Sequence, residues 1–271
     1  MKPYVVLHKE VGQTPLQVIE AYKLAHPDLS TLPMAYAGRL DPMASGKLLV
    51  LIGEECKVQE KYHGLDKEYI FEVLFGVSSD TADVLGLLKT CEVSPVTAAF
   101  LRTIAKRLEG HIELPYPHFS SKTVGGKPLH IWTLEGKISQ INIPTKHSVI
   151  HSLKLVDLKQ VHAQEVYVTA TEKIETIAKV TQESKKLGND FRRADVRIAW
   201  QKFIDERDQE ELFYIAKFVC VASSGTYMRT LAELIANEVH TCGLAYSIER
   251  TKIGVYKKLF NMIGMWTKQY R

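Results

Sequence analysis

Five consecutive apolar residues, Leu48 to Ile52, end at Gly53, and this run restricts the fold more than any other feature of the sequence. The run is short for a helix and has no polar position. It therefore predicts a strand that is buried on both faces. A chain with such a strand needs a sheet whose two faces are covered by other parts of the protein.

Further strands and helices are predicted on both sides of this run. A strand is expected at 4–8, and alternation from Lys67 to Phe75 predicts another. Thr14, Pro15 and Gln17 form an N-cap, an N1 proline and a capping-box partner, so a helix should begin there and run to about Leu24. The remaining expectations are a helix at 95–108 with Phe100, Leu101, Ile104 and Leu108 on its sheet-facing stripe, a helix at 172–187 ended by Gly188, and strands at 195–204 and 212–222. Neighbouring antiparallel strands interleaved with helices favour an α+β fold with a mixed, mainly antiparallel sheet.

Composition excludes some classes of protein and leaves others open. The 271 residues contain no stretch of eighteen apolar residues and no apolar signal segment, so we expect a cytoplasmic protein. A net charge of +4 and a pI of about 8.7 are compatible with a polyanionic partner but do not establish one. The cysteines are widely spaced, and no C-x-x-C occurs. We expect reduced, mostly buried thiols without a disulfide framework or a zinc site: Cys56, Cys91, Cys220 and Cys242.

The segment 37–46 places Asp41 in sterically open surroundings. Pro42 biases Asp41 toward extended geometry, and Gly38 and Gly46 leave space around it. Such a segment can present one carboxylate to a bulky ligand. Asp, Pro and Gly are also ordinary turn residues, so local chemistry leaves a plain turn equally open.

Arg229 falls in the first turn of a helix whose N-cap is expected at Thr226. The inner face of that helix would be Met228, Leu231, Leu234, Ile235 and Val239. A cation is unfavourable at a helix N-terminus, so Arg229 calls for a compensating anion. Asp41 or an RNA phosphate could supply it, and a solvent-facing arginine is the alternative.

Three other segments carry polar or aromatic side chains of possible function. Asp80 and Asp83 could bind a metal, although carboxylates in a serine-rich turn more often cap turns and helices. Residues 115–130 form a long stretch without periodicity that contains Lys122 and Lys127, a mixture typical of RNA-contacting loops and also of ordinary surface loops. Tyr69 alone is compatible with a half-buried strand aromatic.

Five blocks of the sequence resemble, in order, the motifs of the TruB-type pseudouridine synthases. They are 37–46, Lys67-Glu68-Tyr69 with 80–83, the 115–129 stretch, 224–230 and 250–255. The resemblance implies the pseudouridine synthase fold over a single catalytic domain, 1–271, with a thumb loop at 115–140 and an extended region at 150–210. Only 17 residues follow Gly254, so a C-terminal PUA domain is not expected within this chain.

The resemblance also implies an isomerase that converts uridine to pseudouridine in RNA, most often the T-loop uridine 55 of tRNA, without a cofactor or a metal. Asp41 would be the nucleophile or base, Tyr69 would stack on the flipped uracil, and Arg229 would pair with Asp41 and hold it ionised. The expected partner is RNA, in the first place the T-arm of tRNA, and the protein is expected to be a monomer. Substrate-binding residues would be Tyr36, Gly38, Arg39, Lys122, Lys127, Tyr227, Ile248 and Ile253.

Some positions depart from the family pattern. Tyr36 stands where the family has a histidine, residues 114–118 lack a double proline, and Lys9-Glu10 replaces a Lys-Pro pair. Alternative functions are therefore an inactive RNA-binding or RNA-folding module, a synthase acting on another RNA, and an aspartate-dependent hydrolase. The hydrolase would need a second carboxylate, for which Asp80 and Asp83 are the candidates.

Overall fold

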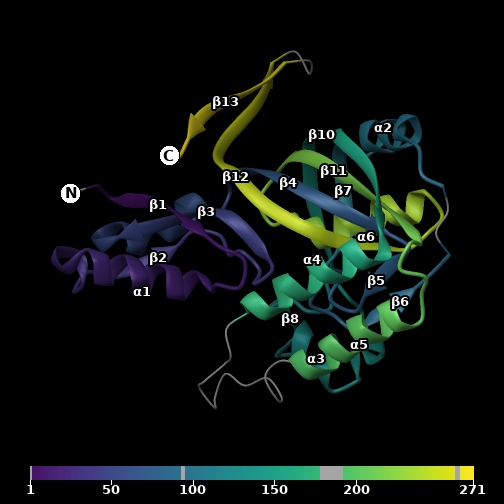
Figure 1. The fold of residues 1–271 in the computed structure, drawn as a ribbon. Coiled ribbons are helices and arrows are strands. Elements are labelled where there is room, and N and C mark those ends of the chain that lie inside the picture. The colour runs from purple at the N-terminus through teal and green to yellow at the C-terminus, as the bar shows by residue number, and fades with distance from the viewer. Residues whose placement is uncertain (1, 93–94, 178–191, 260–262) are drawn as a thin grey trace.

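The computed structural model describes residues 2–92, 95–177, 192–259 and 263–271, and its main feature is a large twisted sheet (Figure 1). In spatial order the path of the sheet is β1-β3-β12-β4-β11-β10-β7, with β2 added to β3 and β13 added to β12. The strands are β1 (Tyr4–Lys9), β2 (Met34–Tyr36), β3 (Ala44–Ile52), β4 (Asp66–Phe75), β7 (Gly110–Pro115), β10 (Thr145–His162), β11 (Leu212–Ala222), β12 (Gly243–Leu259) and β13 (Ile263–Gln269).

The pairing is mixed and mainly antiparallel, as the sequence predicts. Ile248–Arg250 of β12 pairs in parallel with Ala44–Gly46 of β3, whereas the other neighbouring pairs of this sheet run antiparallel. The apolar run in β3 is buried on both faces, which confirms the prediction. Leu48 and Val50 pack toward α1 (Pro15–Ala25), and Leu49 and Leu51 pack into a separate cluster around Ile253.

Helices cover both ends of the sheet (Figure 1). The capping box at the start of α1 is present, since the Thr14 hydroxyl accepts from the Gln17 backbone and the Gln17 side chain accepts from the Thr14 backbone. α2 (Ala98–Arg107) packs on β10 as expected, although Phe100 faces solvent instead of the sheet. α6 (Met228–Glu238) packs on β12 and β4. None of the helices in the described ranges is both long and apolar enough to cross a membrane.

The region between β10 and β11 differs from the prediction. Residues 195–204, expected as a strand, lie in helix α5 (Arg193–Asp205), which packs on α4 (Ala163–Thr176). The buried side chains Val196, Trp200, Phe203 and Ile204 follow helical spacing, and the Trp200 indole donates to Val84 O at 3.0 Å. The helix expected at 172–187 overlaps the end of α4, which begins at Ala163 and ends at Thr176, and positions 178–187 lie outside the described part of the chain.

The 115–140 thumb is more regular than a plain loop. Strands β8 (Thr123–Val124) and β9 (Lys127–Pro128) form a hairpin, and α3 (Leu129–Leu134) follows at once. The Trp132 indole of α3 donates to Val124 O at 3.0 Å and ties the helix back to the hairpin. The thumb is therefore a small folded unit. The sequence hid it because its strands have two residues each.

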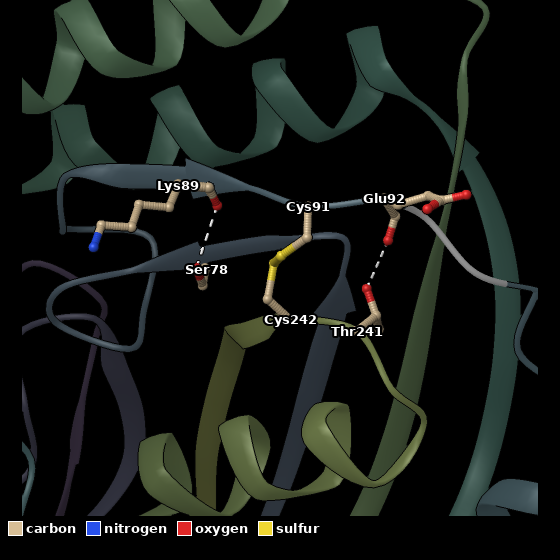
Figure 2. Close-up of a disulfide and its surroundings, with 6 residues drawn as sticks. All are labelled: Ser78, Lys89, Cys91, Glu92, Thr241 and Cys242. Carbon is tan, nitrogen blue, oxygen red and sulfur yellow. Dashed lines mark hydrogen bonds between the residues drawn. A yellow bond between two sulfur atoms is a disulfide. The ribbon is translucent and has the colours of Figure 1, made fainter.

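A disulfide joins Cys91 to Cys242, which overturns the expectation that all four cysteines are reduced (Figure 2). Cys91 follows β6 (Leu88–Thr90), which forms a hairpin with β5 (Val77–Ser79), and Cys242 precedes β12. The Thr241 hydroxyl donates to Glu92 O at 2.8 Å beside the bridge. The two cysteines are 151 positions apart, so their spacing in the sequence gives no hint that they meet. Cys56 and Cys220 are free thiols.

We expect reduction of this disulfide to lower the free energy of unfolding by about 2–4 kcal/mol, because the bridge closes a long loop in the unfolded chain. Urea unfolding of the oxidised and reduced protein, and of Cys91→Ser, measures the difference. Cys56→Ser is the control, since Cys56 lies outside the bridge. Equal urea midpoints for the oxidised and reduced protein would contradict this expectation.

Candidate active site

A cavity of about 420 Å³ opens where β3, β4, β12, the start of α6 and the thumb meet. Its lining residues come from parts of the chain that are far apart in sequence. They are Gly38, Arg39, Leu40, Asp41, Ala44, Lys67, Tyr69, Phe119, Ser120, Ser121, His130, Ser224, Gly225, Thr226, Tyr227, Met228, Arg229, Ile248 and Arg250. Its volume lies within the range typical of small-molecule pockets.

Asp41 lies in the short connection between β2 and β3. Its backbone carbonyl accepts from Ala44 N at 3.0 Å, which turns the chain into β3. The carboxylate stays partly accessible, with 37% of the side chain exposed, and Oδ2 accepts from Arg229 Nε at 2.8 Å. The ion pair expected from the sequence is therefore present, and the carboxylate faces a cavity rather than open solvent.

Arg229 is buried, with 4% of its side chain exposed, and it links three segments to α6. Nη1 donates to Thr81 O at 2.8 Å and Nη2 donates to Phe119 O at 3.2 Å, while Asp83 Oδ2 lies 3.8 Å from Nε. Burial opposes the charge of the guanidinium, yet Asp41 and Asp83 outweigh it and raise the Arg229 pKa. One charged side chain thus joins the Asp41 segment, the 80–83 turn and the thumb.

The start of α6 differs in detail from the prediction. Its N-cap is Tyr227, and the Thr226 hydroxyl donates to Ser223 O at 2.9 Å instead of capping the helix. Arg229 still lies in the first turn, where the helix dipole disfavours a cation. The two nearby carboxylates offset that cost.

The acidic pair at 80–83 forms turn contacts, as the structural reading of the sequence predicts. Asp83 Oδ1 accepts from Leu85 N at 2.9 Å and from the Thr81 hydroxyl at 2.6 Å. Asp80 accepts from Leu87 N at 2.9 Å and pairs with Arg192. Burial raises the pKa of Asp83, and Arg229 opposes that rise. In the described ranges, no group of three or more His, Cys, Asp or Glu side chains could hold a metal ion.

Two buried cations bond to the backbone around Asp41. Lys9 of β1 donates to Ala44 O at 2.6 Å and to Glu10 O at 2.9 Å, and burial lowers its pKa to about 8 although Asp41 acts against that shift. Arg250 of β12 donates to the backbone carbonyls of Gly38, Arg39 and Lys47 at 3.1, 3.2 and 2.7 Å. The backbone on both sides of Asp41 is therefore held by positively charged side chains.

Tyr69 lies in β4 directly opposite Arg250 of β12. Burial raises the pKa of the Tyr69 hydroxyl, while the adjacent Arg250 guanidinium acts in the opposite direction. Ile248, two residues before Arg250, forms an apolar part of the cavity wall. An aromatic ring and an apolar wall thus flank the carboxylate, as a planar ligand would require.

The other expected substrate-binding residues divide into two groups. Gly38, Arg39 and Tyr227 line the cavity with Asp41. The rest do not. Ile253 is 0% exposed in the cluster under β3, and Tyr36 lines a separate hollow of about 500 Å³ that shares only Gly38 and Arg39 with the first.

The two expected thumb lysines also lie outside the cavity. Lys122 Nζ lies 5.2 Å from the centre of the Tyr116 ring, and that ring meets Tyr227 edge to face at 5.7 Å. Lys127 pairs with Glu135 at 2.8 Å. Other thumb residues line the cavity directly, and Tyr116 contacts the wall through Tyr227, whereas Lys122 and Lys127 do not line it.

Reading of the sequence missed Lys9, Lys67, His130 and Arg250 as site residues. Lys67 and Arg250 belong to blocks that resemble the family motifs, and this position could have indicated that they lie at the site. No local sequence pattern distinguishes a buried cation from a surface one. His130 Nδ1 lies 3.0 Å from Ser120 O, a contact that only the folded thumb creates.

Comparison with known proteins gives the same family for most of the chain. The family model described as TruB family pseudouridylate synthase (N terminal domain) matches residues 29–176. The chain is 27% identical over 256 residues to tRNA pseudouridine synthase B of Caldicellulosiruptor saccharolyticus, covering 94% of this chain and 69% of the relative. It is 29% identical over 238 residues to tRNA pseudouridine synthase 4 of Saccharomyces cerevisiae, covering 79% and 59% respectively.

A solved structure supports the fold independently. The chain matches a crystal structure of a Cbf5–Nop10–Gar1 complex with a TM-score of 0.53 and 15% identity, over 93% of this chain and 48% of that one. The present chain thus spans about half the length of that structure. The family model covers more than half of the 271 residues, including the segments that carry Asp41 and Tyr69, and the chain therefore belongs to the TruB family of pseudouridylate synthases.

Proposed function

We propose that this protein is an isomerase that converts uridine to pseudouridine in RNA, that its substrate is the T-loop uridine of tRNA, and that it acts as a monomer. The observation that carries the proposal is the Asp41 carboxylate, which is paired with buried Arg229 at 2.8 Å and faces the cavity. The two relatives named above are both tRNA pseudouridine synthases, which supports tRNA as the substrate.

In the proposed reaction, a uridine leaves its RNA stack and enters the cavity. Extruding a base costs a few kcal/mol, and an unpaired loop nucleotide lowers that cost. Asp41 acts as nucleophile or base and starts cleavage of the bond between C1′ and N1. The uracil turns between Tyr69 and Ile248 and rejoins the ribose through C5.

Arg229 keeps Asp41 oriented in this scheme. Its other bonds to Thr81 O and Phe119 O make the position of the carboxylate depend on the 80–83 turn and on the thumb. In this proposal, a movement of the thumb when RNA binds would shift the Asp41 carboxylate, because Arg229 bonds to both. Outside the cavity, the proposal assigns Lys122 and Lys127 to RNA phosphates, a role for which Lys127 would have to exchange its bond to Glu135.

The decisive measurement is the pseudouridine content of a T-loop transcript after incubation with the protein, together with maps of total RNA with and without the gene. We expect pseudouridine at the T-loop position only when the protein is present. An unchanged T-loop signal with pseudouridine lost elsewhere would assign the enzyme to another RNA. If the protein were an RNA-folding module, the wild type and Asp41→Asn would have the same effect on the transcript. If it were a hydrolase, it would release free uracil.

The structure offers little for the hydrolase alternative. That chemistry needs a second carboxylate beside the first. Neither Asp80 nor Asp83 lines the cavity, because Asp80 is bound to Arg192 and Asp83 is enclosed by its own turn.

A further inference from the structure

Lys67 places a buried ammonium group at the wall of the cavity. It lies two residues before Tyr69 in β4, so both side chains lie on the same face of the sheet. Its Nζ donates to Leu65 O at 2.6 Å and to the Ser224 hydroxyl at 2.9 Å, and the residue is only 5% exposed. An ammonium has three donors. Two of them are used by the described residues, and the third is free for a ligand.

Lys67 has no carboxylate within ion-pair distance among the described residues. The acidic residue next to it, Asp66, is bound to His151 Nε2 at 3.0 Å and to Tyr256 N at 2.8 Å. Arg250, on the neighbouring strand, donates to three backbone carbonyls and bonds to the Tyr69 side chain, and among the described residues it forms no ion pair with a carboxylate. Two buried cations without a counter-ion are costly to fold, and they create a positive potential at this side of the cavity.

Gly38 leaves this positive region open to a ligand. A Cβ atom built at Gly38 would lie 3.6 Å from Arg250 Nη1 and 3.8 Å from Lys67 Cε. A larger side chain at this position would therefore contact both cationic side chains and block a ligand from reaching them. The φ angle of +93° also favours glycine here. The absence of a side chain at Gly38 lets a planar group reach the cations from the Asp41 side.

The proposed reaction generates an anion in this cavity. Whether Asp41 acts as nucleophile or base, the C1′–N1 bond breaks and its electron pair stays on the uracil ring. The charge is shared by N1 and the two carbonyl oxygens. The ring then forms the C5–C1′ bond, C5 loses its proton and N1 gains one, so no other reactant is consumed. Stabilisation of a developing charge by fixed donors is commonly a large part of catalysis.

We infer that Lys67 is a further catalytic residue, whose ammonium donates to a carbonyl oxygen of the departing uracil and stabilises its negative charge, with Arg250 as the positioning residue. This inference rests on the proposed isomerisation. Arg250 acts indirectly, because it holds the backbone of Gly38 and Arg39 and lies beside Tyr69.

The surroundings of Lys67 should make its action depend on pH. Burial lowers the pKa of the ammonium to about 8, Arg250 adds to that shift and Asp66 opposes it. A protonated Lys67 is required, so we expect the rate to fall as pH rises through about 8. The other titratable and charged groups around the cavity are Asp41 and Arg39 before β3, Tyr69 on β4, His130 in the thumb, and Tyr227 and Arg229 at the start of α6.

Lys67→Met tests the inference because it keeps the length of the side chain and removes its charge. With a T-loop transcript, we expect the single-turnover rate to fall about 100-fold, in line with the loss of one transition-state donor, while the Kd for RNA changes little. Lys252→Met is the matched control. Lys252 pairs with Glu68, which lies between Lys67 and Tyr69 and points to the opposite face of β4.

A second RNA separates electrostatic catalysis from a structural role. Fluorine at C5 of uridine withdraws electrons and makes uracil a better leaving group. We therefore expect Lys67→Met to consume 5-fluorouridine in this RNA only about 10-fold more slowly than the wild type, measured at about pH 7. An equal loss on both RNAs, or no loss on uridine, would overturn the inference. Failure of the wild-type protein to form pseudouridine in any RNA would instead reject the proposed function.

Lys67→Arg, which keeps the positive charge, provides a further check that does not depend on whether Lys67→Met folds. A guanidinium stays charged across the range studied, so Lys67→Arg should retain activity and should lose the decline of the rate near pH 8. If the wild-type rate does not fall above about pH 8, or if Lys67→Arg shows the same fall as the wild type, the inference is rejected.

Discussion

Asp41→Asn should lower the rate of pseudouridine formation by at least about 10⁴-fold, because an amide cannot act as the nucleophile or base that starts cleavage of the C1′–N1 bond. The protein should remain folded. The Asn side-chain oxygen can still accept from Arg229 Nε, and the side chain is partly exposed, so we expect a melting temperature within a few degrees of the wild type. Single-turnover kinetics on a T-loop transcript and thermal unfolding measure the two quantities.

Glu249→Gln is the matched control for this variant. Glu249 is an exposed carboxylate of β12, between Ile248 and Arg250, and it does not line the cavity. Its replacement should leave the rate unchanged. A large drop in melting temperature for Asp41→Asn with the activity retained would show that Asp41 is a structural residue.

Arg229→Met should have a large effect on both stability and activity. It removes a buried guanidinium that bonds to Asp41, Thr81 O and Phe119 O, and it leaves Asp83 buried without its cation. Breaking a buried ion pair from one side costs about 3–5 kcal/mol. We expect a fall of that size in the free energy of unfolding, measured in urea, and a loss of activity of at least about 10³-fold.

A double variant distinguishes the cause of the lost stability. Asp83→Asn in the Arg229→Met background removes the uncompensated carboxylate, so it should restore part of the stability and none of the activity. Additive losses from the two changes would contradict this explanation.

The pH dependence of Arg229→Met has a defined sign. Burial raises the pKa of Asp83, and the loss of Arg229 removes the opposing charge. The folded state then binds a proton more tightly than the unfolded state, so the free energy of unfolding should rise as pH falls. A stability difference from the wild type that does not change with pH would show that Asp83 is not responsible.

Part of the fold could be predicted from local patterns. The capping box of α1, the doubly buried run in β3 and the strand β11 were predicted because each depends on neighbouring residues and on one periodicity. Helix α5 was mistaken for a strand because Val196, Ile198 and Ile204 are β-branched. Its packing on α4 and the bond from Trp200 to Val84 O override that preference.

The candidate site could be predicted only in part. The sequence by itself determined the family through ordered motifs, and it indicated that Arg229 needed an anion. The tertiary structure decided which residues meet. It brought Asp41, Tyr69, Lys67 and Arg250 to one cavity, placed Ile253 in the core, and joined Cys91 to Cys242. Burial, ion pairing and a disulfide depend on distances between strands far apart in the chain, and local sequence does not encode those distances.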